Sequence, residues 1–103
     1  MIKQLIIFTT ICHFLAPFAY SSSANLSHGE NIFRQCRMCH GKNGDKSPMR
    51  QSRAINSLNQ NEIYQALLAR KNGEIEGAGN TVKARLSETD MQDVAAFIQT
   101  LSE

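Results

Sequence analysis

The segment Cys36-Arg37-Met38-Cys39-His40 decides the fold prediction for this chain of 103 residues. Residues three and four apart lie on one face of an α-helix, so a helical segment would present Cys36, Cys39 and His40 together. Two thiols followed at once by an imidazole form the C-x-x-C-H pattern of covalent heme attachment. We therefore predict one heme c, held by two thioethers from Cys36 and Cys39. His40 is the predicted iron ligand, with its other ring nitrogen donating to a loop carbonyl near Pro48.

Other chemistries fit the same five residues less well. A disulfide between Cys36 and Cys39 would close a very short loop and gain little entropy. A zinc site needs four ligands, and only Cys36, Cys39, His40 and His28 would remain to supply them after cleavage of the N-terminal segment. His40, directly beside Cys39, is poorly placed to share a tetrahedron with it. A thioredoxin-like redox pair requires strands that alternate with helices, and no segment shows sustained strand-like alternation. The heme interpretation is therefore preferred.

The N-terminal segment, residues 1–24, has the pattern of a secretory signal peptide. Lys3 precedes an apolar run from Leu5 to Ala19, which is shorter than the roughly 20 residues of a membrane-spanning helix. Small residues follow this run, and we expect cleavage near residues 21–24. We predict a periplasmic or otherwise exported protein with residues 25–103 as its domain. An uncleaved N-terminal segment is the alternative, and it would bring the protein into contact with a membrane.

Composition excludes several classes of function. The chain carries 11 Lys and Arg against 9 Asp and Glu, a net charge of +2, which is too small a basic excess for a dedicated nucleic-acid binder. It has no Trp, and a domain of this size buries little core without a staple such as a cofactor. No nucleophile with a base, no paired carboxylates and no phosphate loop are visible. We therefore predict that the protein is not an enzyme.

Three pairs of residues have the spacing of a helix-capping box: Ser27 with Glu30, Asn59 with Glu62, and Ser87 with Asp90. The pairs predict helices over residues 28–39, from 59 to a stop at Gly73, and over 87–101. The last helix has apolar residues at steps of three and four: Met91, Val94, Ala95, Ile98 and Leu101. With no strand expected, the sequence predicts an all-α fold in which two long connections, 41–57 and 73–85, join the helices.

Beyond the motif, residues 27–101 resemble a small class I cytochrome c, close to the short bacterial cytochromes of the c553 type. The likeness rests on the residues around the motif and on the last helix: Gly29, Ile32, Phe33, Gly41 and the segment 86–98. The resemblance implies a small cytochrome c fold, with three main helices wrapped around one covalently bound heme. It also implies a one-electron carrier between periplasmic or membrane-associated redox proteins.

The resemblance further implies a methionine ligand to the iron from the loop before the last helix, but residues 77–85 contain no methionine. The candidates for the ligand at the sixth coordination position of the iron are therefore Met49, Met91, Asn80, Lys83 or none. Met91 is expected in the core, His28 is expected to be exposed, and Lys83 must lose a proton before it ligates. An open or weakly ligated iron would suit a domain that binds or senses a small ligand. An electron-transfer subunit of a periplasmic oxidoreductase is a further alternative.

Charge is distributed unevenly along the chain. Residues 34–53 contain six basic residues and one acidic residue, Asp45, whereas four basic and seven acidic residues follow from Asn59 onward. A basic surface around an exposed heme edge would attract the acidic surface of a redox partner. An ordinary solvated surface is the other interpretation of the same pattern.

Overall fold

Six helical segments follow one another in the computed structural model, which describes residues 23–48 and 53–102. The three main helices are α1 (Leu26–Phe33), α3 (Gln60–Lys71) and α5 (Glu88–Gln99). The short segments are α2 (Arg37–His40), the 3-10 turn η2 (Ile55–Ser57) and α4 (Asn80–Lys83). The predicted all-α fold with three main helices is confirmed. The two predicted loops differ in detail, because each contains a short helical segment, η2 in one and α4 in the other.

The predicted signal peptide lies outside the described residues, apart from its last two positions. Its cleavage near residues 21–24 therefore stays a prediction. In the part of the chain that the structure describes, no helix is long and apolar enough to cross a membrane.

Reciprocal capping boxes begin α3 and α5 at the predicted residues. The side chain of Asn59 accepts a hydrogen bond of 2.8 Å from the backbone of Glu62, whose carboxylate accepts one of 3.0 Å from the backbone of Asn59. Ser87 and Asp90 make the same pair of bonds, both 3.0 Å long. These bonds satisfy backbone N–H groups that have no partner within a helix's first turn, so the capping pattern located both helix starts.

A Schellman turn ends α3 close to the predicted stop. The N–H of Gly73 donates to the carbonyl of Arg70 at 3.2 Å, and the N–H of Glu74 donates to that of Ala69 at 2.9 Å. The φ angle of Gly73 is 77°, a left-handed conformation that glycine adopts without steric cost. The helix therefore ends at Lys71, two residues before the predicted stop.

The first helix differs from its prediction at both ends. Asn25 caps it, because its side chain accepts a 3.0 Å bond from the N–H of His28, and Ser27 is already inside the helix. The helix ends at Phe33 instead of continuing to residue 39. The backbone of Cys36 bonds to the carbonyl of Phe33 at 2.8 Å, and this tighter i→i+3 turn interrupts the α-helical pattern. The motif consequently begins a separate short helix, α2.

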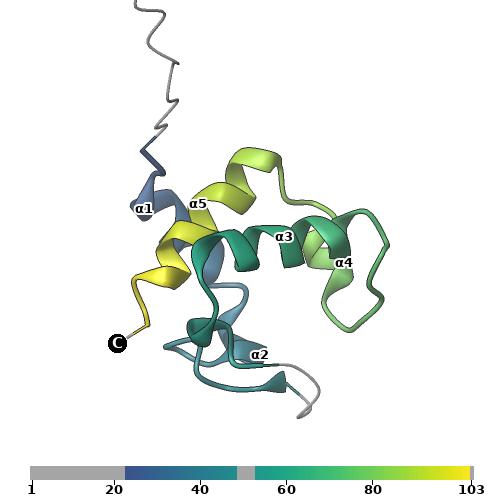
Figure 1. The fold of residues 1–103 in the computed structure, drawn as a ribbon, viewed down its shortest axis with the longest axis horizontal. Coiled ribbons are helices and arrows are strands. Elements are labelled where there is room, and N and C mark those ends of the chain that lie inside the picture. The colour runs from purple at the N-terminus through teal and green to yellow at the C-terminus, as the bar shows by residue number, and fades with distance from the viewer. Residues whose placement is uncertain (1–22, 49–52, 103) are drawn as a thin grey trace, which may run out of the picture.

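The packing of α1 and α3 on α5 forms the core of the molecule (Figure 1). Its buried members are hydrophobic: Ile32, Phe33, Ile63, Leu86, Met91, Val94, Ala95 and Ile98. The rings of Phe33 and Phe97 extend this contact, with centroids 5.6 Å apart. Gly29 lies where α1 meets α5, and a Cβ at this position would overlap the backbone carbonyl of Asp93. The two helices can therefore approach this closely only because residue 29 has no side chain.

Two polar contacts tie the start of α1 to α5. The backbone N–H of Asn25 donates to the buried carboxylate of Asp93 at 3.0 Å. The Nε2 atom of His28 lies 2.8 Å from Oδ1 of Asp90. The His28 hydrogen bond, followed by the bond from the backbone of Ser87, lowers the pKa of Asp90.

We expect Gly29→Ala to destabilise the folded protein by about 1–3 kcal/mol, because the added methyl group overfills the contact between α1 and α5. This is the net loss that remains after the gain of roughly 1 kcal/mol that alanine brings to a helix interior. Urea unfolding of the heme-loaded protein measures the difference. The exposed Ser27→Ala is the matched control on the same helix, expected to stay within about 0.5 kcal/mol. Equal effects of the two variants would contradict the close contact.

Asp90 makes stability depend on pH in a defined direction. A carboxyl whose pKa is lower in the folded state contributes stability above its ordinary pKa, and that contribution is lost as the pH falls through the lowered value. Replacing Asp90 by Asn is therefore expected to destabilise the protein at neutral pH, with the difference from wild type shrinking as the solution becomes acidic. Thermal unfolding of both proteins across this pH range measures the difference. A difference that stays constant down to strongly acidic pH would contradict this role of Asp90.

Candidate heme site

Helix α2 carries the C-x-x-C-H motif, with Cys36 immediately before its first residue and His40 as its last. Gly41 follows with a φ angle of 82°, and its N–H donates to the carbonyl of Arg37 at 2.8 Å. A Cβ on Gly41 would lie only 2.7 Å from Oδ1 of Asp45. Glycine therefore lets the chain leave the motif directly after His40.

Both cysteines of the motif are free thiols. Cys36 is half-buried, whereas Cys39 is exposed, and Met38 between them is 94% exposed. Burial, the largest influence, raises the pKa of the Cys36 thiol, while the positive charge of Lys83 opposes the increase. The motif thus presents two unpaired sulfur atoms at the boundary between the domain interior and its surface. Met38 lies at the surface.

The surroundings of the His40 ring favour its neutral form. Burial lowers the pKa of His40, and the positive charges of Lys83 and Arg70 lower it further. A neutral imidazole has a free lone pair, which is what a metal requires of a histidine ligand. Its Nδ1 atom is buried and has no hydrogen-bond partner among the described residues. The hydrogen bond expected from this ring to a carbonyl near Pro48 is not made by Nδ1 within the described residues. Residues 49–52, next to Pro48, lie outside the described range, so this bond stays a prediction.

The residues of this site fit a heme c. Buried nitrogen atoms normally have hydrogen-bond partners, yet Nδ1 of His40 and Nε of Arg37 lack them within the described ranges. Such orphaned atoms beside two free thiols are consistent with a site built around a further group. The described residues hold no cluster of three or more His, Cys, Asp or Glu side chains that could by themselves bind a metal ion.

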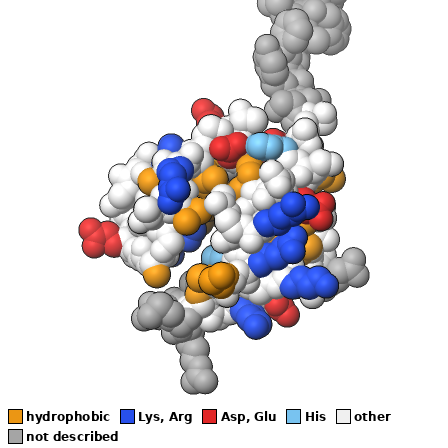
Figure 2. All heavy atoms as spheres, turned by 180° about the vertical axis from the view of Figure 1, so that it is seen from behind, with side chains coloured by type: hydrophobic (Ala, Val, Ile, Leu, Met, Phe, Trp, Pro, Cys, Tyr) orange, Lys and Arg blue, Asp and Glu red, His pale blue; other side chains and the backbone are white. Residues whose placement is uncertain are grey.

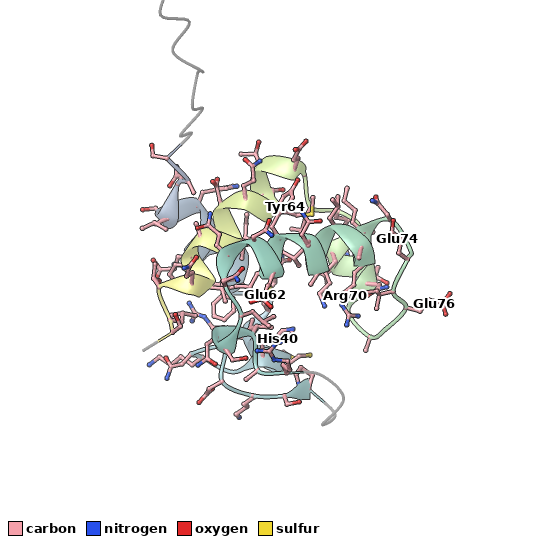
Figure 3. All side chains as sticks on the ribbon, viewed as in Figure 1. His40, Glu62, Tyr64, Arg70, Glu74 and Glu76 are labelled. Carbon is pink, nitrogen blue, oxygen red and sulfur yellow. The ribbon has the colours of Figure 1, made fainter. Side chains whose placement is uncertain are left out.

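Two cations from other elements influence the motif, Arg70 at the end of α3 and Lys83 at the end of α4. Figure 3 shows Arg70 extending from α3 on the side of the molecule where His40 lies. The guanidinium of Arg70 donates to the amide oxygen of Asn80 over 3.5 Å. No pattern around Arg70 in the sequence indicates that this residue lies near the motif. Its position in the last turn of a helix is a common one for a basic residue.

The other candidates for the sixth ligand are occupied elsewhere or lie outside the described residues. Met91 is 1% exposed and belongs to the core, as expected. Asn80 donates through its amide nitrogen to the carbonyl of Ile75 at 2.7 Å. His28 is bound to Asp90 and partly exposed. Met49 falls in the range that the structure does not describe.

This small all-α domain carries a C-x-x-C-H segment whose two thiols are free and whose histidine has a ring nitrogen that is unpartnered among the described residues. These are the features of a heme c protein. The chain belongs to the cytochrome c family, because residues 26–102 match the family model described as Cytochrome c. Members of this family carry heme and take part in electron transfer. The resemblance inferred from the sequence is thereby confirmed.

The chain is similar to bacterial cytochromes c-553 over most of its length. It is 27% identical over 88 residues to cytochrome c-553 of Helicobacter pylori (strain J99 / ATCC 700824), covering 84% of this chain and 92% of the relative. It is 26% identical over 104 residues to cytochrome c-553 of Nitratidesulfovibrio vulgaris (strain DSM 19637 / Miyazaki F), covering 96% of this chain and 99% of that protein.

The buried position of Met91 leads to a prediction for Met91→Leu. Leucine has a similar volume, so we expect a loss below about 1.5 kcal/mol in unfolding free energy. Because the Met91 side chain packs in the core, the visible spectrum of the heme-loaded protein should stay unchanged. Urea unfolding and absorption spectra of the purified variant measure both quantities. A large spectral change would show that Met91 leaves the core to bind the iron.

Proposed function

We propose that this protein is a monoheme one-electron carrier that works outside the cytoplasm. Cys36 and Cys39 bind one heme c through two thioethers, and His40 binds the iron. The observation that carries the proposal is the pair of free thiols beside a buried, unpartnered imidazole nitrogen, in a chain that belongs to the cytochrome c family.

The residues of the domain would hold and insulate this group. When bound, the heme supplies an iron that gains and loses one electron, with a potential set by its axial ligands and its burial. His40 is kept neutral by burial and by the two nearby cations, so its ligating nitrogen does not have to compete with a proton. The core of α1, α3 and α5 supports the segment from which α2 extends, so the motif is attached to a rigid element.

An exported location is supported by the N-terminal segment and by the chemistry of the motif. Residues 1–24 have the features of a signal peptide. A covalently attached cofactor cannot dissociate from a protein that works outside the cell's reducing interior. It also suits a small domain, whose core is too small to hold a non-covalently bound cofactor. We infer a periplasmic or otherwise exported carrier, and no independent enzymatic activity.

The surface around the motif would serve as the contact for redox partners. Met38 and Cys39 are exposed there, and basic residues flank them in the chain: Arg34, Arg37, Lys42 and Lys46. Figure 2, which views the molecule from behind, shows Lys and Arg side chains gathered on one side of that face, near a group of hydrophobic side chains. Positive charge beside an exposed apolar contact favours a partner with an acidic surface, because the opposite charges raise the rate of encounter.

Heme staining after denaturing electrophoresis tests the proposal. Protein produced with a working cytochrome maturation system should keep its stain, because thioether bonds survive unfolding. The double variant Cys36→Ala/Cys39→Ala should lose the stain entirely. In His40→Ala the stain should remain, whereas the spectrum of a histidine-ligated heme should disappear.

Met38→Ala is the matched control inside the motif, because Met38 is exposed and is assigned no bond to the heme. It should keep both the stain and the spectrum. A wild-type protein that loses its heme on denaturation would overturn the attachment. A His40→Ala variant with an unaltered spectrum would overturn the ligand assignment.

A further inference from the structure

Lys83 is the last residue of α4, and its side chain turns back toward the start of that helix. Its Nζ atom lies 3.7 Å from the point where a Cβ would stand on Gly79, the residue that caps α4. Because Gly79 has no side chain, residue 79 leaves this space free. The amine of Lys83 lies at its edge, in the same loop that lacks a methionine.

The same amine interacts electrostatically with the attachment motif. The charges of Cys36 and Cys39 both act on Lys83, and the charge of Lys83 in turn acts on Cys36 and His40. Lys83 is therefore within electrostatic range of all three side chains that would bind the heme, although it lies on a different helix. Within the described residues, Lys83 is the only candidate for the sixth position that combines this location with an available donor atom.

Among the residues that the structure describes, the side-chain nitrogen of Lys83 has no hydrogen-bond or ion-pair partner. Its cationic neighbour is Arg70. By contrast, the amine of Lys71 on the adjacent helix donates to the carbonyl of Ala84 at 2.9 Å. A half-buried ammonium beside a guanidinium is unfavourable. Burial, with Arg70 second, accordingly lowers the pKa of Lys83.

We propose that Lys83 supplies the sixth ligand of the heme iron through its Nζ amine. This inference rests on the proposed heme attachment through Cys36, Cys39 and His40. The lone pair of the amine forms the bond to the iron, the displaced proton passes to water, and no oxidation state changes. The ligand set would be two nitrogen donors, from His40 and Lys83, in place of one nitrogen and one sulfur.

The test uses the full-length heme-loaded protein in its ferric state, with absorption and electron paramagnetic resonance spectra as readouts. Wild type should be low-spin and should lack the sulfur-to-iron charge-transfer band of a methionine ligand. Lys83→Ala and Lys83→Arg should both lose the low-spin signal and bind added cyanide faster than wild type. The arginine variant is decisive because a guanidinium keeps the positive charge but has no available lone pair.

Lys71→Ala is the matched control, since it removes a lysine from the neighbouring helix whose amine already has a protein partner. Its spectrum should equal that of wild type. Proton NMR of the reduced wild-type protein gives a readout that needs no variant. Methylene signals of one lysine should be shifted strongly by the porphyrin ring current.

Each alternative has its own signature. A high-spin wild type, or one that binds cyanide as fast as Lys83→Ala, would overturn the proposal and show an open iron. A sulfur-to-iron band that Met49→Leu or Met91→Leu abolishes would assign a methionine instead. A low-spin Lys83→Arg would show that only the charge matters. Failure of the heme stain would overturn the proposed function itself, whereas a stained protein with any of these spectra would overturn this inference alone.

Discussion

The close approach of α1 and α5 is the contact on which the rest of the structure depends. Gly29 permits it, since any side chain at that position would meet the backbone of α5. Asn25 and His28 then reach the carboxylates of Asp93 and Asp90. With α1 held in this way, the tight turn after Phe33 directs the motif out of the core and toward the surface.

Two cations from other helices lie within electrostatic range of the attachment motif. Arg70 and Lys83 place two positive charges near a neutral imidazole and two thiols, and no carboxylate of the described residues forms an ion pair with either cation. Unpaired charge in a half-buried position is costly, so this arrangement favours the loss of a proton from Lys83, which ligation of the iron by its amine would require. The sulfur and nitrogen donors of the motif and these two cations act as one site, although they come from three helices.

Local sequence patterns predicted much of this fold because their physical causes are local. The capping boxes at Asn59 and Ser87 satisfy backbone donors within one turn, so their start positions were correct. The same pattern failed at Ser27, where Asn25 offers an equally good cap two residues earlier and is also held by Asp93. Whether the helix continued through the motif could not be decided locally, because the tighter turn there depends on how α1 packs.

The sequence by itself determined the family and the residues proposed to bind the heme. The C-x-x-C-H spacing places two thiols and one imidazole together within a single helical turn. The sequence also determined that the loop before α5 has no methionine. Only the tertiary structure decided which other residues face the motif. Arg70 and Lys83 are far from His40 in the chain, and the packing of α3 on α5 and of α4 on α3 brings them near it. Long-range packing of this kind leaves no periodicity or spacing in the sequence from which it could be inferred.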